Sequence, residues 1–200
     1  MSKTFNHIND SRQFVVEKLS DDALLGRRGN VMRQSLYVWQ YEPSQERFAK
    51  DLVAAICSDD LPARGVNPLI VNIYDIVLDF LDSEGMWEPL VEAEGEASRE
   101  EIIMMLQDTV SVNGVIAPKV NEIVAENHDA DIVFLCGVGE TYPYVRTHSI
   151  LTELTTPKPV VLVFPGRFEQ RQDGSTSLDI LNIDQGASGG YYRATNVYDL

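Results

Sequence analysis

The sequence predicts an α/β fold: a mainly parallel sheet with helices on both faces and an antiparallel hairpin near its C-terminal end. The first observation is Asp131–Phe168, which reads as strand, loop, helix and strand. Its two apolar runs, 132–136 and 160–164, are too short for helices and typical of strands buried on both faces. The second observation is Asp173-Gly174 between alternating segments, which predicts an antiparallel hairpin that pairs 160–168 with 177–182.

The N-terminal part of the chain predicts a peripheral helix and then a strand. Residues 1–30 are mostly polar, and amphipathic spacing within them predicts a helix over 14–25. Ser35–Tyr41 is rich in β-favouring aromatic residues and predicts the first strand. We expect residues 1–200 to form a single α/β domain, because this length suits one domain with its own core.

A helix and a second strand follow. Ser44 is placed to cap a helix that begins at Gln45. Apolar residues recur four apart along that helix, at Phe48, Leu52 and Ile56. The apolar run Leu69–Tyr74 predicts the second strand, with Asp75 at its carboxyl end.

Three further helices are expected before the central strand. A short one covers Ile76–Leu81 and ends in a polar cluster. Ser98 and Glu101 form the S-x-x-E pattern of a capping box, which predicts a helix through 102–110. Residues 120–125 predict another helix, so helices and strands alternate in the order typical of a parallel sheet.

Composition excludes several classes of protein. The hydrophobic share is 44%, and no apolar run reaches the ~20 residues that a membrane helix needs. Residues 1–10 are polar and give no leader signal. Cys57 and Cys136 are too few for a disulfide framework or a zinc site, so we expect a cytoplasmic protein without a bound metal.

The acidic charge is concentrated in the middle of the chain. The net charge is −15, and residues 67–140 contain 2 basic and 16 acidic side chains. Residues 1–66 are balanced, and residues 141–200 carry 5 basic and 6 acidic side chains. Direct binding of nucleic acid is not expected, because phosphate contacts need a basic face. A basic protein partner fits this distribution better.

One interpretation places a ligand site at the carboxyl edge of the sheet, where open α/β sheets bind ligands. The residues expected there are Glu42, Asp75, Gly137, Gly139, Glu140, Arg146 and Arg167. The alternative is ordinary capping of a helix predicted over Thr141–Leu154, in which Glu140 meets the helix dipole and pairs with Arg146. Capping is the favoured interpretation, because capping side chains are far commoner than catalytic ones.

No motif announces an enzyme. We expect the sheet to share the topology of P-loop nucleotide hydrolases, but the turn at 41–47 (YEPSQER) has no glycine or lysine to hold a phosphate. Gly137-Val138-Gly139 lacks the third glycine of a dinucleotide fingerprint. We therefore expect no cofactor and no catalytic residues.

The acidic stretch 84–101 has two interpretations. One is a solvated surface, which charge runs usually form. The other is a docking surface for a basic partner, in which apolar side chains anchor the contact amid the charge. Its candidate residues are Met86, Trp87, Glu92, Glu94 and Glu96.

Four segments together resemble the BrxB family of BREX bacteriophage-defence systems: FLCGVGETYPYVRTH at 134–148, VLVFPGRF at 161–168, YYRA at 191–194 and YEPSQER at 41–47. The resemblance covers most of the chain and carries no catalytic residues. It implies a small cytoplasmic subunit of a multiprotein assembly that blocks phage replication and supports methylation of host DNA. Its neighbours would be a PglZ-like protein, a large ATPase and an adenine methyltransferase.

Two functions follow as expectations. The first is a non-catalytic adaptor or scaffold that binds another BREX subunit, the PglZ-like protein above all, and reaches DNA only indirectly. The second is a nucleotide- or phosphate-binding enzyme or sensor that uses the carboxyl edge of the sheet.

Overall fold

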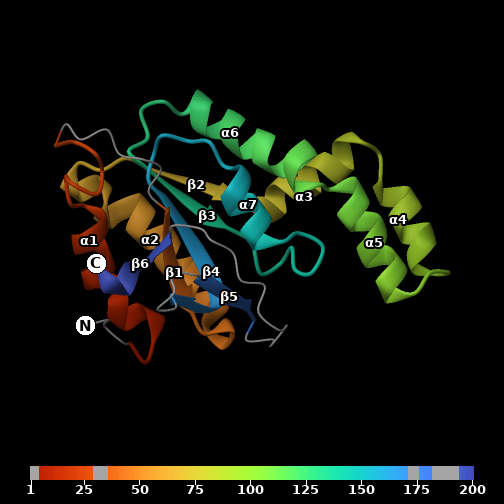
Figure 1. Cartoon of the computed structure of the whole chain (residues 1–200), viewed down its shortest axis with the longest axis horizontal. Coiled ribbons are helices and arrows are strands. Elements are labelled where there is room, and N and C mark those ends of the chain that lie inside the picture. The colour runs from red at the N-terminus through yellow and green to blue at the C-terminus, as the bar shows by residue number, and fades with distance from the viewer. Residues whose placement is uncertain (1–4, 29–35, 171–175, 182–193) are drawn as a thin grey trace.

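A computed structural model describes residues 5–28, 36–170, 176–181 and 194–200, which form a sheet between two layers of helices (Figure 1). Its helices and strands, in chain order, are α1 (Arg12–Leu19), β1 (Leu36–Tyr41), α2 (Glu46–Ala55), β2 (Pro68–Asn72), α3 (Ile73–Ser83), α4 (Trp87–Glu94), α5 (Arg99–Thr109), α6 (Ala117–Glu126), β3 (Ile132–Cys136), α7 (Thr147–Glu153), β4 (Val160–Gln170), β5 (Thr176–Ile180) and β6 (Ala194–Asn196).

The sheet confirms the predicted fold class. Its strands lie in the order β2-β3-β4-β1-β6, all parallel to their neighbours, and β5 pairs antiparallel with β4. The C-terminal hairpin is thus confirmed, with Phe168 opposite Leu178. Asp173-Gly174, which predicted its turn, lies outside the described residues. The likeness to P-loop topology stays a prediction.

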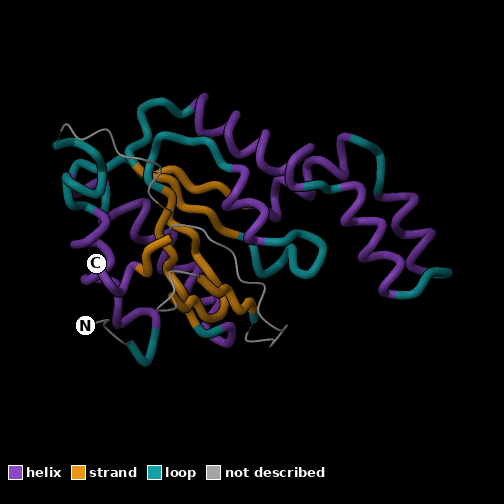
Figure 2. The backbone as a smooth tube through the Cα atoms, in the orientation of Figure 1, coloured by secondary structure: helices purple, strands orange, loops and turns teal. Residues whose placement is uncertain are grey.

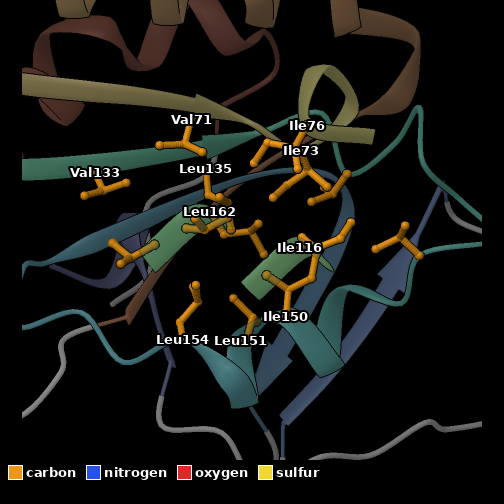
Figure 3. Packing of buried hydrophobic residues seen from close by; sticks show 14 of the residues in the cluster. Val71, Ile73, Ile76, Ile116, Val133, Leu135, Ile150, Leu151, Leu154 and Leu162 are labelled. Atoms are coloured by element: carbon orange, nitrogen blue, oxygen red, sulfur yellow. The ribbon is translucent and has the colours of Figure 1, made fainter. Parts of the chain in front are cut away.

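Two apolar layers result from the alternation of side chains along the strands. In β1, Leu36 and Val38 belong to one layer, whereas Trp39 and its neighbours Tyr37 and Tyr41 belong to the other. Helices α3, α6 and α7 cover the first face, and α1 and α2 cover the second (Figure 2). Figure 3 shows Ile150, Leu151 and Leu154 near Leu135 and Leu162 of the first layer. Burial on both faces explains the continuous apolar runs of β3 and β4.

The helix expected over Thr141–Leu154 is half wrong. Helix α7 begins only at Thr147, and the backbone before it forms turns. Proline disfavours the helical conformation in the residue before it, so Pro143 keeps Tyr142 out of a helix. Arg146 is extended (φ −94°, ψ 116°) and forms the N-cap of α7.

The second strand is shorter than expected, which changes the place of Asp75. Strand β2 ends at Asn72, whose side-chain oxygen accepts a hydrogen bond of 3.0 Å from the backbone N–H of Tyr74. This cap starts α3 at once, at Ile73. Asp75 therefore lies exposed in the first turn of α3 rather than at a strand end.

The N-terminal helices also differ in detail. Helix α1 ends at Leu19, and turns follow, with Gly26 at φ 71°. The hydroxyl of Ser44 makes no capping bond, because a short 3-10 turn, Pro43–Gln45, precedes α2. Phe48, expected on the buried stripe of α2, is largely exposed.

Helices α4 and α5 form a helical hairpin beyond α3, away from the sheet (Figure 1). We call residues 84–109 the acidic hairpin. The capping box of Ser98 and Glu101 is confirmed at the start of α5. Helix α4 was not predicted as a separate element, because the acidic stretch was interpreted only as a solvated or docking surface. No helix of the described residues has the length and apolar character to cross a bilayer.

Candidate docking site

The carboxyl edge of the sheet carries an ion-pair cluster. Glu140 follows β3, and its carboxylate lies 2.5 Å from Nζ of Lys50. The same ammonium lies 3.1 Å from Glu46, one helical turn earlier on α2. The carboxylates raise the pKa of Lys50, above all through the hydrogen bond to Glu140. The expected partner of Glu140 was Arg146, and sequence reasoning did not foresee Lys50.

Neither arginine of the predicted edge forms an ion pair with Glu140 in the described part of the chain. Arg146 is exposed at the start of α7, and no ion pair of the described residues includes it. Arg167 lies within β4, opposite Asp179 of β5. With Glu42, Arg167 lines a shallow cavity of about 240 Å³ near the end of β1. The structure thus brings Glu42 and Arg167 together, and Asp75 and Arg146 lie elsewhere.

The two glycines of the edge have structural reasons. Gly137 has φ +82°, and a Cβ atom there would lie 1.9 Å from Oδ1 of Asn72, the cap of α3. A Cβ atom on Gly139 would lie 2.8 Å from Cγ of Pro165. Both glycines pack closely against a neighbouring strand, Gly137 against the end of β2 and Gly139 against β4, which accounts for glycine without a ligand.

The two cysteines and His148 have pKa values shifted mainly by burial. Burial raises the pKa of the Cys57 and Cys136 thiols to about 12, so neither is a ready nucleophile. Burial first, and Arg146 second, lower the pKa of His148 on α7. No group of three metal-binding side chains gathers anywhere in the part of the chain that the structure describes.

The acidic hairpin holds the predicted partner-binding residues, and it also holds a groove. Trp87, Leu90, Val91 and Glu94 lie at helical spacing on one face of α4. That face lines a groove of about 470 Å³ between α3, α4 and α5. Met86, just before α4, is half-buried and packs against the first apolar layer. Glu92 and Glu96 are exposed on the hairpin outside the groove lining.

Sequence reasoning missed the other walls of this groove. Helix α3 contributes Tyr74, Val77, Leu78 and Leu81, and α5 contributes Arg99, Ile102 and Leu106. Tyr144, from the turns before α7, completes the lining, and burial raises its pKa to about 12. The spacing i, i+3, i+4 and i+7 was visible in α3 and α4, but which helix faces which was not.

Large apolar side chains remain exposed on the acidic hairpin. Val91 is 66% exposed, Met104 55% and Trp87 40%. In addition, no residue of α4 or α5 is fully buried. Residues 84–109 also contain eight acidic side chains and one basic side chain, Arg99. None of these charged groups forms an ion pair with a described residue. Apolar anchors within an unneutralised acidic surface can bind a basic protein.

Comparison with known proteins decides the family. A sequence model described as "BREX protein BrxB" matches residues 69–197, which include the whole acidic hairpin. The chain belongs to the BrxB family. A BrxB protein of Bacillus cereus (strain H3081.97) is 22% identical over 198 residues, or 96% of this chain and 98% of the relative. One of Escherichia coli O9:H4 (strain HS) is 23% identical over 130 residues, or 62% of this chain and 59% of the relative.

These matches confirm the family resemblance that the sequence segments indicated. They also confirm that the chain is a BREX protein. The BrxB match begins at Leu69, so it covers β2 to β6 and leaves out α1, β1 and α2. No solved structure matches the chain.

Proposed function

We propose that the chain is a non-catalytic adaptor in a BREX anti-phage defence complex, and that it binds another BREX subunit through the acidic hairpin. The PglZ-like protein is the first partner to test, followed by the large ATPase and the methyltransferase. The observation that carries the proposal is the exposure of Trp87 and Val91 on a hairpin whose carboxylates lack ion-pair partners among the described residues.

The distribution of exposed apolar residues supports this surface over others. Five large apolar side chains of the described residues are exposed, and three of them, Trp87, Val91 and Met104, lie on the acidic hairpin. Exposed apolar side chains that cluster mark interaction sites, whereas single ones such as Phe48 and Ile70 are ordinary. The hairpin also extends away from the sheet, so a partner can reach it without displacing the core (Figure 1).

Charge supports an indirect rather than a direct role at DNA. The net charge is −15, and the acidic hairpin would be repelled by phosphates. We therefore propose that the chain reaches DNA only through the subunits that it binds.

A pull-down tests the proposal. The tagged full-length chain is captured from cells that carry the complete BREX operon, at moderate and at high salt. The first variant is Glu92→Gln/Glu94→Gln/Glu96→Gln on the acidic hairpin. The matched control removes three exposed carboxylates elsewhere, at Glu17, Asp51 and Glu153, and changes the net charge equally.

We expect a BREX subunit to copurify, and the hairpin variant to retain less of it than the control. High salt should weaken the complex, because charge attraction is screened over about 8 Å already at physiological ionic strength. Absence of any BREX subunit from the eluate would reject the adaptor proposal. Equal losses in both variants would place the contact outside the acidic hairpin.

The alternative, a nucleotide or phosphate ligand at the carboxyl edge, has less support. Glu140 is occupied by Lys50, and Asp75 lies on α3. Glu42 and Arg167 do share a cavity, but a carboxylate at its wall disfavours a phosphate. A melting-temperature shift with nucleotide and divalent metal, lost in Arg167→Ala, would favour this alternative.

A further inference from the structure

We infer that the groove between α3, α4 and α5 binds an amphipathic helix of the partner subunit, with basic residues beside its apolar stripe. We call it the hairpin groove, defined by the residues that line its walls above. This inference rests on the proposed adaptor function and specifies the partner element that the acidic hairpin recognises.

The walls of the hairpin groove are helix faces. Val77 and Leu81 of α3, and Trp87 and Val91 of α4, each lie four residues apart and thus on one side of their helix. Two apolar stripes therefore face the same space. A helix with an apolar stripe normally buries it against another element, so the space suits one more helix.

The hairpin groove is only partly filled by the chain itself. Its volume is about 470 Å³, and Val91 on its wall is 66% exposed. A neighbouring helix would remove Val91 and Trp87 from water and supply the hydrophobic gain that the hairpin lacks alone. Docking of an amphipathic helix into an apolar groove is a general mode of recognition, with anchors at i, i+3, i+4 and i+7.

The occupant is a helix rather than a strand, because the groove walls are helices. Backbone N–H and C=O groups inside a helix are already paired, so α3, α4 and α5 offer an extended peptide no edge to pair with. A docked helix satisfies its own backbone and needs only side-chain contacts.

The charged residues in and around the groove indicate the charge of the occupant. Glu94 lines the groove directly, and Glu88, Glu92 and Glu96 are exposed on the same hairpin. Arg99 also lines the groove and is the one basic side chain of residues 84–109, which contain eight acidic ones. Lysine or arginine beside the apolar stripe of the partner would meet these carboxylates, whereas a second acidic copy of this chain would be repelled.

Tryptophan fluorescence offers a direct readout. The chain has two tryptophans, and Trp39 is buried, with its Nε1–H donating to the hydroxyl of Tyr198 at 3.0 Å. Trp87 is 40% exposed at the groove, so quenching by acrylamide reports mainly on Trp87. The full-length chain is titrated with the BREX subunit that copurifies, and then with overlapping synthetic peptides that cover that subunit.

We expect binding to shield Trp87, and one peptide with apolar residues at helical spacing and flanking Lys or Arg to reproduce the effect. Trp87→Phe should remove the change in quenching. Val91→Asp should weaken binding of the subunit by about tenfold or more, because a charge then enters the apolar contact. Phe48→Asp is the matched control: Phe48 is 46% exposed on α2, outside the acidic hairpin and the groove lining, so the affinity of this variant should stay within about twofold.

The outcomes separate this inference from the proposed function. If a subunit copurifies but Val91→Asp binds it as well as the parent chain does, the hairpin groove is not the site, and the adaptor role stands. A bound peptide that is acidic or lacks helical spacing would equally overturn the inference. If no BREX subunit copurifies, both the proposed function and this inference fail.

Discussion

At the scale of single residues, Gly137 joins the end of β3 to the start of α3. The φ of Gly137 is +82°, a backbone conformation that residues with a side chain rarely adopt. The side chain of Asn72 occupies the space where a Cβ atom of residue 137 would lie. The side chain of Asn72 accepts the N–H of Tyr74 and so starts α3, which forms one wall of the hairpin groove. A change at Gly137 therefore acts on the candidate site through the cap.

We expect Gly137→Ala to lower the free energy of unfolding by about 2 kcal/mol or more, because alanine is strained at positive φ and would displace the cap. Gly95→Ala is the control: Gly95 has φ −76°, and a Cβ there would be 3.6 Å from the carbonyl oxygen of Glu92, an ordinary contact. Urea unfolding of both variants measures the difference. Equal midpoints would contradict the role given to Gly137.

Residue-level partners were the least predictable part of the chain. The sequence placed Glu140 in the loop after β3 correctly, but its ion pair with Lys50 depends on how α2 packs against that loop. The pattern of charges along the chain carries no information on such pairs. Glu42 and Arg167 are far apart in sequence. Both could be expected at one edge of the sheet, but the sequence did not show that these two would line the same cavity.

At the scale of elements, capping shows what local sequence can decide. Ser98 accepts from the N–H of Glu101, and the Glu101 carboxylate accepts from the N–H of Ser98, as the S-x-x-E pattern predicted. Ser44 is also a serine just before a helix. The turn Pro43–Gln45 lies between, however, so α2 begins only at Glu46 and Ser44 does not cap it. A capping residue is predictable when its partner is also in the sequence pattern.

Ser98→Ala should destabilise α5 by about 1 kcal/mol, a typical cost of losing an N-cap, and Ser44→Ala should leave α2 within about 0.5 kcal/mol. Hydrogen exchange of the amides in 99–105 and 46–52 measures the two effects locally. The hydrogen bonds that Ser98 donates to the Glu101 carboxylate, first from its backbone N–H and second from its hydroxyl, also lower the pKa of Glu101. The cap is therefore strongest above the ordinary pKa of a glutamate and weakens as pH falls through the lowered value. Equal exchange in Ser98→Ala and the parent chain would argue against the cap.

Helix α4 was missed for a physical reason. Proline is unfavourable inside a helix, but Pro89 is the third residue of α4. The first four N–H groups of a helix have no partner within it, so proline there removes no hydrogen bond. Pro118 of α6 is tolerated in the same way near its start. Pro143 would have been the third residue of the predicted helix over Thr141–Leu154, yet α7 begins only at Thr147, so the position of a proline alone does not decide whether a helix forms.

At the scale of the whole molecule, the sheet and the acidic hairpin differ in how they are held. Strands β1, β3 and β4 are buried between two layers of helices, whereas α4 and α5 have no fully buried residue. The parallel sheet could be predicted because strands buried on both faces need continuous apolar runs. The order of the strands could not, because an apolar run does not identify its neighbour.

Hydrogen exchange should separate these two parts of the molecule. We expect amides of α4 and α5 to exchange at least about tenfold faster than those of α6, because few apolar contacts oppose local opening. Helix α6 is a suitable control, since it is of similar length and buries Val120 and Val124. Addition of the copurifying subunit should slow exchange in α4 and α5 alone. Protection equal to that of α6 in the isolated chain would contradict this difference.

The position of β1 in the sheet has a consequence for how the chain folds. Strand β1 pairs Leu36 with Val160 of β4 and with Ala194 of β6, so both of its neighbours are synthesised long after it. Contacts between residues so distant in sequence make folding slow, because a long loop must close before they form. Until then the apolar segment Leu36–Tyr41 has unpaired backbone and can associate with other nascent chains. We therefore expect the yield of native protein to depend on how quickly newly made chains are diluted or bound by chaperones.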